Sequence, residues 1–152
     1  MSADARIAEL GLVLPPAARP IGSYVTYVQT GNLAYTSGHG PSQPDGSLTT
    51  GKLGADLDVA AGAAAARATG LALLATLRHE LGTLDRVTRI VKLVGMVNCT
   101  PDFTEHPQVV NGCSDLLLEV FGEAGRHARS AVGMSSLPLG MAVEIELVVE
   151  VT

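Results

Sequence analysis

Two charged side chains near the C-terminus could do chemistry in a chain that carries few charges. Arg129 opens an apolar stretch, and Glu144 lies inside a second one, beyond Leu137-Pro138-Leu139-Gly140. Charged residues make up 16% of the chain, so charges at the ends of apolar strands indicate a use beyond solubility. A guanidinium is a rigid fork of N–H donors that matches two carboxylate oxygens. The pair therefore predicts a site for a small carboxylate. Two solvated charges at strand ends are the alternative that the pattern leaves open.

The segment 127–146 predicts two strands joined by a tight turn. In an antiparallel ladder centred on that turn, Arg129 would stand opposite Val148 and Glu144 opposite Gly133. Both charged side chains would then point to one face, about four residues or 13 Å apart at the rise of a strand. This spacing excludes a tight ion pair, but it allows the two groups to flank one small molecule.

Length and composition predict a single domain over residues 1–152, of which 1–19 form an N-terminal extension with a short helix. The net charge is −5 and no basic patch is visible, which disfavours a nucleic-acid surface. Two cysteines, Cys99 and Cys113, indicate a reducing compartment without a disulfide framework. The start has no signal-peptide pattern, and the apolar runs break before the ~18 residues of a membrane span. We expect a cytoplasmic protein without a membrane partner.

Periodicity and turn residues indicate the elements that must position the two charges. Helices are expected at 3–11, 56–81 and 107–121, and strands at 24–29, 33–37, 87–97, from Arg129, and at 141–151. The segment 38–54, rich in glycine and proline, is expected to be a loop. This order, ββαβαββ, predicts one sheet of α+β class with its two long helices on one face. The other face then needs a cover, for which a second copy of the chain is the simplest candidate.

The chain also resembles the RidA/YjgF family of small imine and enamine deaminases, from about residue 20 to the C-terminus. The segments that carry the resemblance are Ile21-Gly22-Ser23-Tyr24, Thr30-Gly31-Asn32-Leu33-Ala34-Tyr35-Thr36-Ser37-Gly38, Asp102-Phe103 with Asn111, Arg129-Ser130-Ala131-Val132, and Val143-Glu144-Ile145-Glu146. The resemblance implies a chorismate-mutase-like fold that assembles as a homotrimer, with sites in the clefts between subunits. Family members are often labelled endoribonuclease L-PSP or translation initiation inhibitor.

The resemblance implies roles for particular residues. Arg129 would hold the substrate carboxylate, and Glu144 would manage the water or the proton transfer. The substrate would also meet five further residues: Tyr24, Ser37, Gly38, Asn111 and Ala131. For Tyr24 an ordinary strand aromatic, for Ser37-Gly38 a plain turn, and for Asn111 a structural hydrogen bond are the alternatives.

The sequence departs from the family pattern at three positions. Ala131 stands where many members have cysteine, His39 where glutamine is common, and His127 where proline is frequent. These changes bear on the substrate more than on the fold. The four histidines lack the short spacings of a zinc site, and no metal or other cofactor is expected.

The implied activity is hydrolytic deamination of reactive enamines and imines derived from amino acids, giving a 2-keto acid and ammonia. The enzyme would be of the 2-iminobutanoate/2-iminopropanoate deaminase type and would use neither metal nor covalent nucleophile. Two alternatives remain: a non-catalytic protein that binds small carboxylates or regulates a partner, and a ribonuclease, which the acidic charge disfavours.

Overall fold

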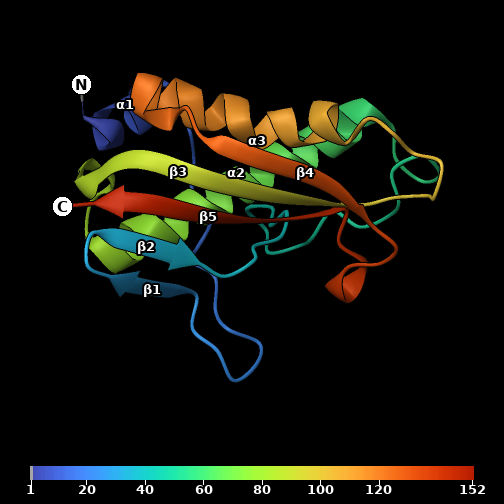
Figure 1. The fold of residues 1–152 in the computed structure, drawn as a ribbon, viewed down its shortest axis with the longest axis horizontal. Coiled ribbons are helices and arrows are strands. Elements are labelled where there is room, and N and C mark those ends of the chain that lie inside the picture. Colours follow the sequence, from blue (N-terminus) through green and yellow to red (C-terminus); the bar gives the residue numbers. More distant parts are fainter. Residues whose placement is uncertain (1) are drawn as a thin grey trace.

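A five-stranded sheet in the order β1-β2-β5-β3-β4 organises the computed structural model, which describes residues 2–152 (Figure 1). Its strands are β1 (Tyr27–Thr30), β2 (Leu33–Thr36), β3 (Val87–Asn98), β4 (Ala128–Met134) and β5 (Val143–Val151). Its helices are α1 (Ala3–Glu9), α2 (Val59–Leu81) and α3 (His106–Phe121), with short 3-10 turns η1 (Leu84–Arg86), η2 (Gly122–Gly125) and η3 (Pro138–Gly140). The predicted order ββαβαββ is confirmed.

The ends of the long helix α2 follow local signals in the sequence. The side chain of Asp58 accepts a hydrogen bond from the Ala61 N–H, which satisfies one of the free donors at the helix start. Gly82 ends the helix with a left-handed backbone, φ 84°, that only glycine adopts without strain. The helix therefore begins three residues later than the predicted 56 and ends where predicted.

The predicted hairpin between the last two strands is wrong. β3 lies between β4 and β5: it pairs with β4 in parallel and with β5 in antiparallel register. The chain leaves β3, crosses through α3, and returns as β4 beside β3, which is how parallel neighbours are normally connected. Arg129 consequently faces Leu93 of β3, not Val148, and Glu144 faces Met96, not Gly133.

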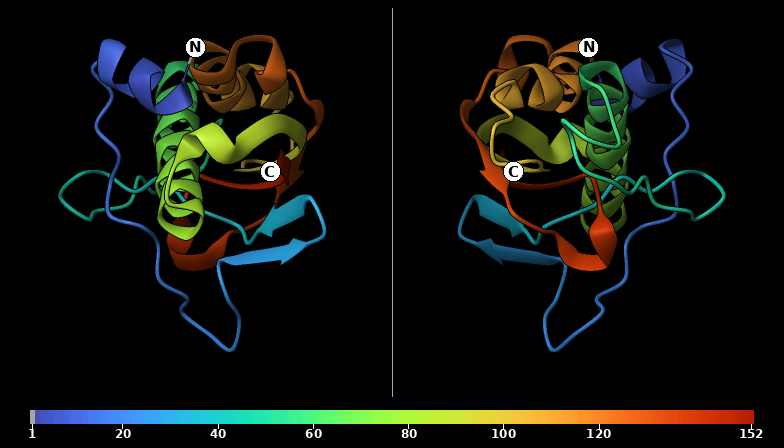
Figure 2. Two further views of the ribbon diagram at one scale, coloured as in Figure 1. Left: turned by 90° about the vertical axis from the view of Figure 1, so that its left-hand side faces the viewer. Right: turned by 90° about the vertical axis from the view of Figure 1, so that its right-hand side faces the viewer.

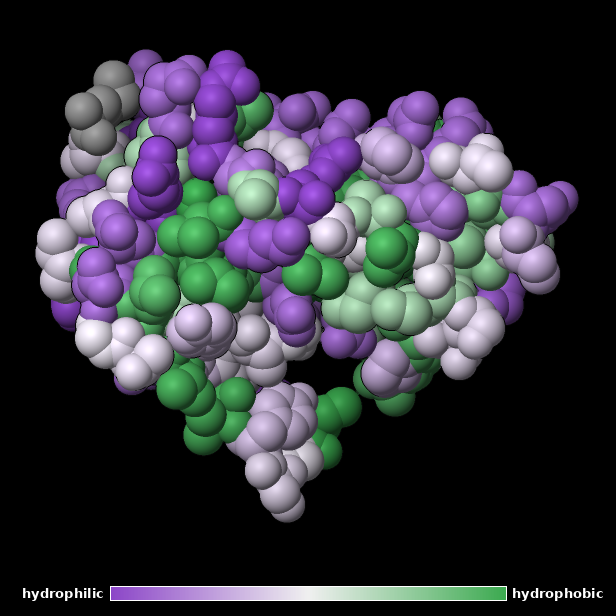
Figure 3. Space-filling view, in the orientation of Figure 1, coloured by the Kyte–Doolittle hydropathy of each residue, from purple (hydrophilic) through white to green (hydrophobic). Residues whose placement is uncertain are grey.

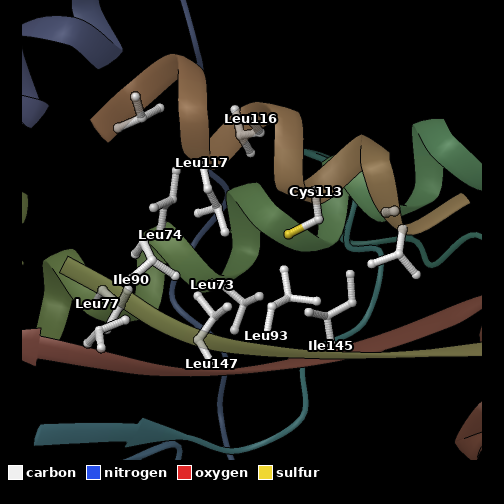
Figure 4. Close-up of a cluster of buried hydrophobic side chains, with 14 of the residues drawn as sticks. Leu73, Leu74, Leu77, Ile90, Leu93, Cys113, Leu116, Leu117, Ile145 and Leu147 are labelled. Carbon is white, nitrogen blue, oxygen red and sulfur yellow. The ribbon is translucent and has the colours of Figure 1, made fainter. Parts of the chain in front are cut away.

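The core lies between the two long helices and one face of the sheet (Figure 4). Leucines of α2 and α3 meet Ile90, Leu93, Ile145 and Leu147, all almost completely buried. The two helices approach closely at Gly112, which has no side chain. A Cβ there would lie 2.0 Å from the backbone oxygen of Ala63. A core built from small side chains thus brings α3 down onto the sheet and beside β4.

Both long helices lie on one side of the sheet, as predicted, and the other side is open (Figure 2). Along β5, buried residues alternate with half-buried or exposed ones, so Glu144, Glu146, Val148 and Glu150 share the open face. Tyr35 is register-paired with both Val28 and Val148, and Val132 with Met96, which adds apolar side chains to this face. Figure 3 shows hydrophobic side chains spread over the open face among hydrophilic ones.

Helix α2 is long and apolar enough, by length and composition, to cross a membrane. No such segment is expected from the sequence, because charged residues and glycines interrupt every apolar run. In the fold, however, 61% of its most apolar window is buried against other parts of the chain. It is the central helix of the core, and a buried core helix can be as long and apolar as a membrane span.

Candidate functional site

Arg129 lies near the start of β4, and its side chain reaches across to α3. Its Nη1 donates to the Asn111 Oδ1 at 2.8 Å and to the Ser114 Oγ at 3.1 Å, and its Nη2 to the Pro107 carbonyl at 3.5 Å. All three partners are neutral. The guanidinium is therefore held in place while its positive charge stays available to a ligand.

The remaining donors of Arg129 suit a carboxylate. A guanidinium carries five N–H groups, and the contacts to α3 use three of them, which leaves the Nε–H and an Nη2–H. A hollow of about 350 Å³ lies beside the side chain. It is lined by Asn111, Ser114, Asp115, Leu118, Arg126, His127 and Arg129. We call it the arginine hollow.

Glu144 lies on the open face of the sheet, near the start of β5 and half-buried. Burial raises the pKa of its carboxyl, and the neighbouring charge of Glu146 raises it further. A carboxyl with a raised pKa releases and takes up a proton closer to neutral pH, which suits it to proton transfer.

A second hollow, of about 640 Å³, opens beside Glu144, and we call it the glutamate hollow. It lies between the loop that hangs below the sheet and the η3 turn, where Figure 3 shows a gap in the surface. Its lining residues are Ala18, Arg19, Ile21, Tyr24, Thr26, Ser37, Gly38, His39, Gly40, Ser42, Gly46, Leu48, Pro138, Leu139, Met141 and Glu144. Apolar and polar side chains are mixed there, as in small-molecule sites generally.

Ser37 and Gly38 leave β2 alongside Glu144. A Cβ at Gly38 would stand 2.1 Å from the Oε2 of Glu144, so the carboxylate rests directly on the bare Gly38 backbone. The Ser37 Oγ is buried and has no hydrogen-bond partner within residues 2–152. A ligand with a polar group could satisfy this hydroxyl.

His39 holds the Ser37-Gly38 segment in place from the side of α2. Its backbone exchanges hydrogen bonds with Ile145, and its ring, 4% exposed, contacts the Ser37 carbonyl through Nδ1 and the Thr76 hydroxyl of α2 through Nε2, both at 2.8 Å. Burial lowers the pKa of the imidazole. The neutral ring therefore donates from Nδ1 and accepts at Nε2, and it holds Ser37-Gly38 in register with β5.

Comparisons with known proteins identify the family of this chain. Residues 4–151 match the model of the family described as "YjgF/chorismate mutase-like, putative endoribonuclease". The chain belongs to this YjgF family. It is 50% identical over 147 residues to Protein TCP17 of Trypanosoma cruzi, covering 96% of this chain and 92% of that one.

Two solved structures extend the YjgF relationship to the fold. The protein Atu1372 of unknown function from Agrobacterium tumefaciens is 43% identical, with a TM-score of 0.91 and coverage of 99% of this chain and 92% of that one. A putative endoribonuclease from Shewanella oneidensis MR-1 is 38% identical, with a TM-score of 0.95 and coverage of 99% and 100%. The expected family and its mixed α+β fold, with one sheet and two main helices, are thereby confirmed.

The site residues predicted for this YjgF protein fall into two groups. Arg129 and Asn111 line the arginine hollow. The glutamate hollow holds Tyr24, Ser37, Gly38 and Glu144. Ala131 lines neither, although it lies on the same face of β4 as Arg129.

The expectation that Arg129 and Glu144 share a face is wrong. Arg129 pairs with the buried Leu93 and points toward α3, whereas Glu144 pairs with Met96 and points to the open face. The insertion of β3 between the two strands causes this difference. Tyr24 also differs from its prediction, since it lies in the loop before β1, where its hydroxyl accepts a hydrogen bond from the Ile21 N–H at 3.3 Å.

Sequence reasoning missed Ser114 as a partner of Arg129 and gave His127 no role. Ser114 follows Asn111 by three residues on α3, so the two share a helix face, and that spacing was an available signal. His127 lies two residues before Arg129 and contacts Ser114, which only the course of the chain after η2 reveals.

Within residues 2–152, no three histidine, cysteine, aspartate or glutamate side chains come together in a group that could hold a metal ion. Cys99 and His106 contact each other as a pair, with Sγ and Nε2 3.5 Å apart.

Proposed function

We propose that this protein hydrolyses reactive imines and enamines derived from amino acids to 2-keto acids and ammonia, at sites formed between copies of the chain. The observation that carries the proposal is the state of Arg129. Its guanidinium is held by neutral partners, keeps free donors, and faces a hollow. Such a group binds a carboxylate, which every 2-imino acid carries next to its reactive carbon.

Glu144 supplies the proton transfers. Its carboxylate takes a proton from a water molecule as the water oxygen bonds to the C2 atom of the iminium. The carbinolamine that results receives that proton on nitrogen, and the C–N bond breaks as Glu144 takes the hydroxyl proton and the C2–O bond becomes a carbonyl. The departing ammonia then takes this proton from Glu144 and leaves as ammonium. Iminium acid and water thus yield 2-keto acid and ammonium, and the raised pKa of Glu144 suits it to both directions of transfer.

A site that uses both groups requires a second copy of the chain. Arg129 and Glu144 point to opposite faces of one sheet, so one protomer cannot surround a small molecule with both. The open face carries exposed apolar side chains such as Val28, Tyr35 and Val132, which a second copy would cover. We propose a homotrimer in which the arginine hollow of one subunit meets the glutamate hollow of the next.

The cellular setting follows the same proposal. Cys99 and Cys113 are buried free thiols, which suits a reducing compartment such as the cytoplasm. Relatives carry the name putative endoribonuclease, but a net charge of −5 argues against RNA as the substrate of this chain.

The proposal is tested by turnover. 2-Iminobutanoate is generated in situ from 2-aminobutanoate by an amino acid oxidase, and release of 2-oxobutanoate is followed with and without the protein. We expect acceleration by the wild type and a loss of roughly 100-fold in kcat/KM for Arg129→Ala, because two charge-assisted hydrogen bonds are removed. Arg78→Ala, at an exposed arginine of α2, is the matched control and should keep wild-type turnover. A wild type that binds 2-oxobutanoate but never accelerates hydrolysis would make the protein a non-catalytic carboxylate binder.

A further inference from the structure

A directional chain of hydrogen bonds runs behind Arg129. The Ser114 Oγ accepts from the Arg129 Nη1 at 3.1 Å and lies 2.9 Å from the Nε2 of His127. The other ring nitrogen of His127, Nδ1, lies 2.7 Å from the Gly125 carbonyl, which can only accept. Nδ1 therefore carries the proton of the neutral ring, Nε2 is an acceptor, and the Ser114 hydroxyl donates to it.

The Gly125 carbonyl, at the end of this series of hydrogen bonds, is fixed by backbone packing. A Cβ at Gly125 would lie 2.3 Å from the Leu117 carbonyl, so the end of η2 lies directly against α3. Ser114 itself is 8% exposed. Both the carbonyl that orients His127 and the hydroxyl that receives Arg129 are thus held by α3, and the arginine side chain has a defined direction.

Charged side chains lie around His127 in the arginine hollow. Asp115, Arg126 and Arg129 line the same hollow, and Arg126 is paired with Glu123 at 3.0 Å. Burial raises the pKa of the Cys113 thiol, below on α3, to about 12, so it adds no charge.

The adjacent strand adds no charge to this face either. Lys92 of β3 reaches the Ser130 hydroxyl on the other face of the sheet.

We propose that Ser114 and His127 are positioning residues for Arg129: the His127 ring accepts a hydrogen bond from the Ser114 hydroxyl, which turns the lone pairs of that oxygen toward the Arg129 Nη1. The inference rests on the proposed function, since it assumes that Arg129 binds a carboxylate. It gives a role to His127. Without the Ser114 contact the guanidinium would keep only its contacts to Asn111 and Pro107 and would be held less firmly.

Binding of 2-oxobutanoate, measured by calorimetry at pH 8, tests the proposal on the assembled protein. His127→Gln keeps an acceptor for Ser114, so its affinity should stay within about twofold of wild type. Ser114→Ala and His127→Leu should weaken binding by roughly three- to tenfold at pH 8.

The controls separate this inference from the proposed function. His79→Gln removes an exposed histidine of α2 and should keep the wild-type affinity. Loss of binding in Arg129→Ala with wild-type affinity in Ser114→Ala and His127→Leu would overturn the inference and leave the proposed function standing. Equal binding by Arg129→Ala and wild type would overturn both.

A measurement on the wild type needs no folded variant. The ¹⁵N chemical shifts of His127 at pH 8 should show the Nδ1–H form, and a ring protonated on Nε2 instead would contradict the proposal.

Discussion

The Glu144 carboxylate rests on the backbone of Gly38, so closely that a Cβ at position 38 would stand 2.1 Å from Oε2. Gly38 keeps an ordinary backbone conformation, so the need for glycine here comes from the space that Glu144 occupies. The contact links the chain after β2 to β5 at the place where the proton-transfer group must lie.

Gly38→Ala should therefore separate stability from turnover. The added methyl meets the far end of a flexible side chain, which can swing aside, so the free energy of unfolding should change by less than about 1 kcal/mol. The displaced carboxylate no longer meets the substrate, and kcat should fall by roughly 10- to 100-fold. Gly40→Ala places a methyl equally close to the Met141 thioether and is the matched comparison, with a smaller loss of kcat. Equal losses in the two variants would contradict the role given to Glu144.

The pH dependence of turnover should report Glu144. As a base it must be ionised, and its pKa is raised by burial and by Glu146. Activity should therefore fall, as the pH drops, at a higher pH than the value of about 4.3 for an ordinary glutamate. Glu144→Gln should lower kcat by roughly 10²- to 10³-fold and remove this limb of the kcat/KM profile. Retention of the limb in Glu144→Gln would assign it to another group.

The raised pKa of Glu144 also predicts that the protein becomes less stable as the pH rises, whereas its activity increases. The folded state holds the Glu144 proton more tightly than the unfolded chain does, so the free energy of unfolding falls as the pH rises through the raised pKa. The protonated Glu144 thus stabilises the folded state fully below the pKa of an ordinary glutamate. This stabilisation is lost once the pH exceeds the raised pKa of the folded state. At pH 7, Glu144→Gln should unfold at an equal or higher Tm than the wild type in calorimetric scans. A clear drop in Tm would mean that the carboxylate is structurally required.

Close packing of α2 on α3 predicts a cost at Gly112. A methyl there would meet the backbone oxygen of Ala63 at 2.0 Å, and backbone cannot swing aside as a side chain can. Gly112→Ala should lower the free energy of unfolding by roughly 2–4 kcal/mol in denaturant titrations. Because α3 carries Asn111 and Ser114, affinity for a 2-keto acid should fall as well. An unchanged midpoint would show that the helices can separate freely.

Most of the fold was predictable because its signals are local. Asp58 and Gly82 bound α2, and alternation along β5 separates its apolar face from Glu144 and Glu146. The neighbour of β4 was not predictable in this way. The turn at Pro138 suggested a hairpin, and only the pairing of β3 with both later strands shows that the chain crosses over instead.

The arrangement of the site could not be predicted for the same reason, because it depends on which strands are neighbours in the sheet. Arg129, Asn111 and Glu144 could be named from residue types and from the resemblance, yet their separation into two hollows depends on which strands are adjacent. The Ser114–His127 contact joins α3 to the chain after η2, and no spacing in the sequence encodes it.

Mixing two inactive variants tests the central claim, that one copy supplies Arg129 and another supplies Glu144. Arg129→Ala and Glu144→Gln are unfolded together in equal amounts and refolded, and exchange of subunits is confirmed by native mass spectrometry. In mixed oligomers, sites that combine the intact Arg129 of one subunit with the intact Glu144 of another should restore roughly a quarter of wild-type imine hydrolysis, as random assembly dictates. Each variant refolded alone should stay inactive. Mixed oligomers that form but show no more activity than either variant alone would contradict the account.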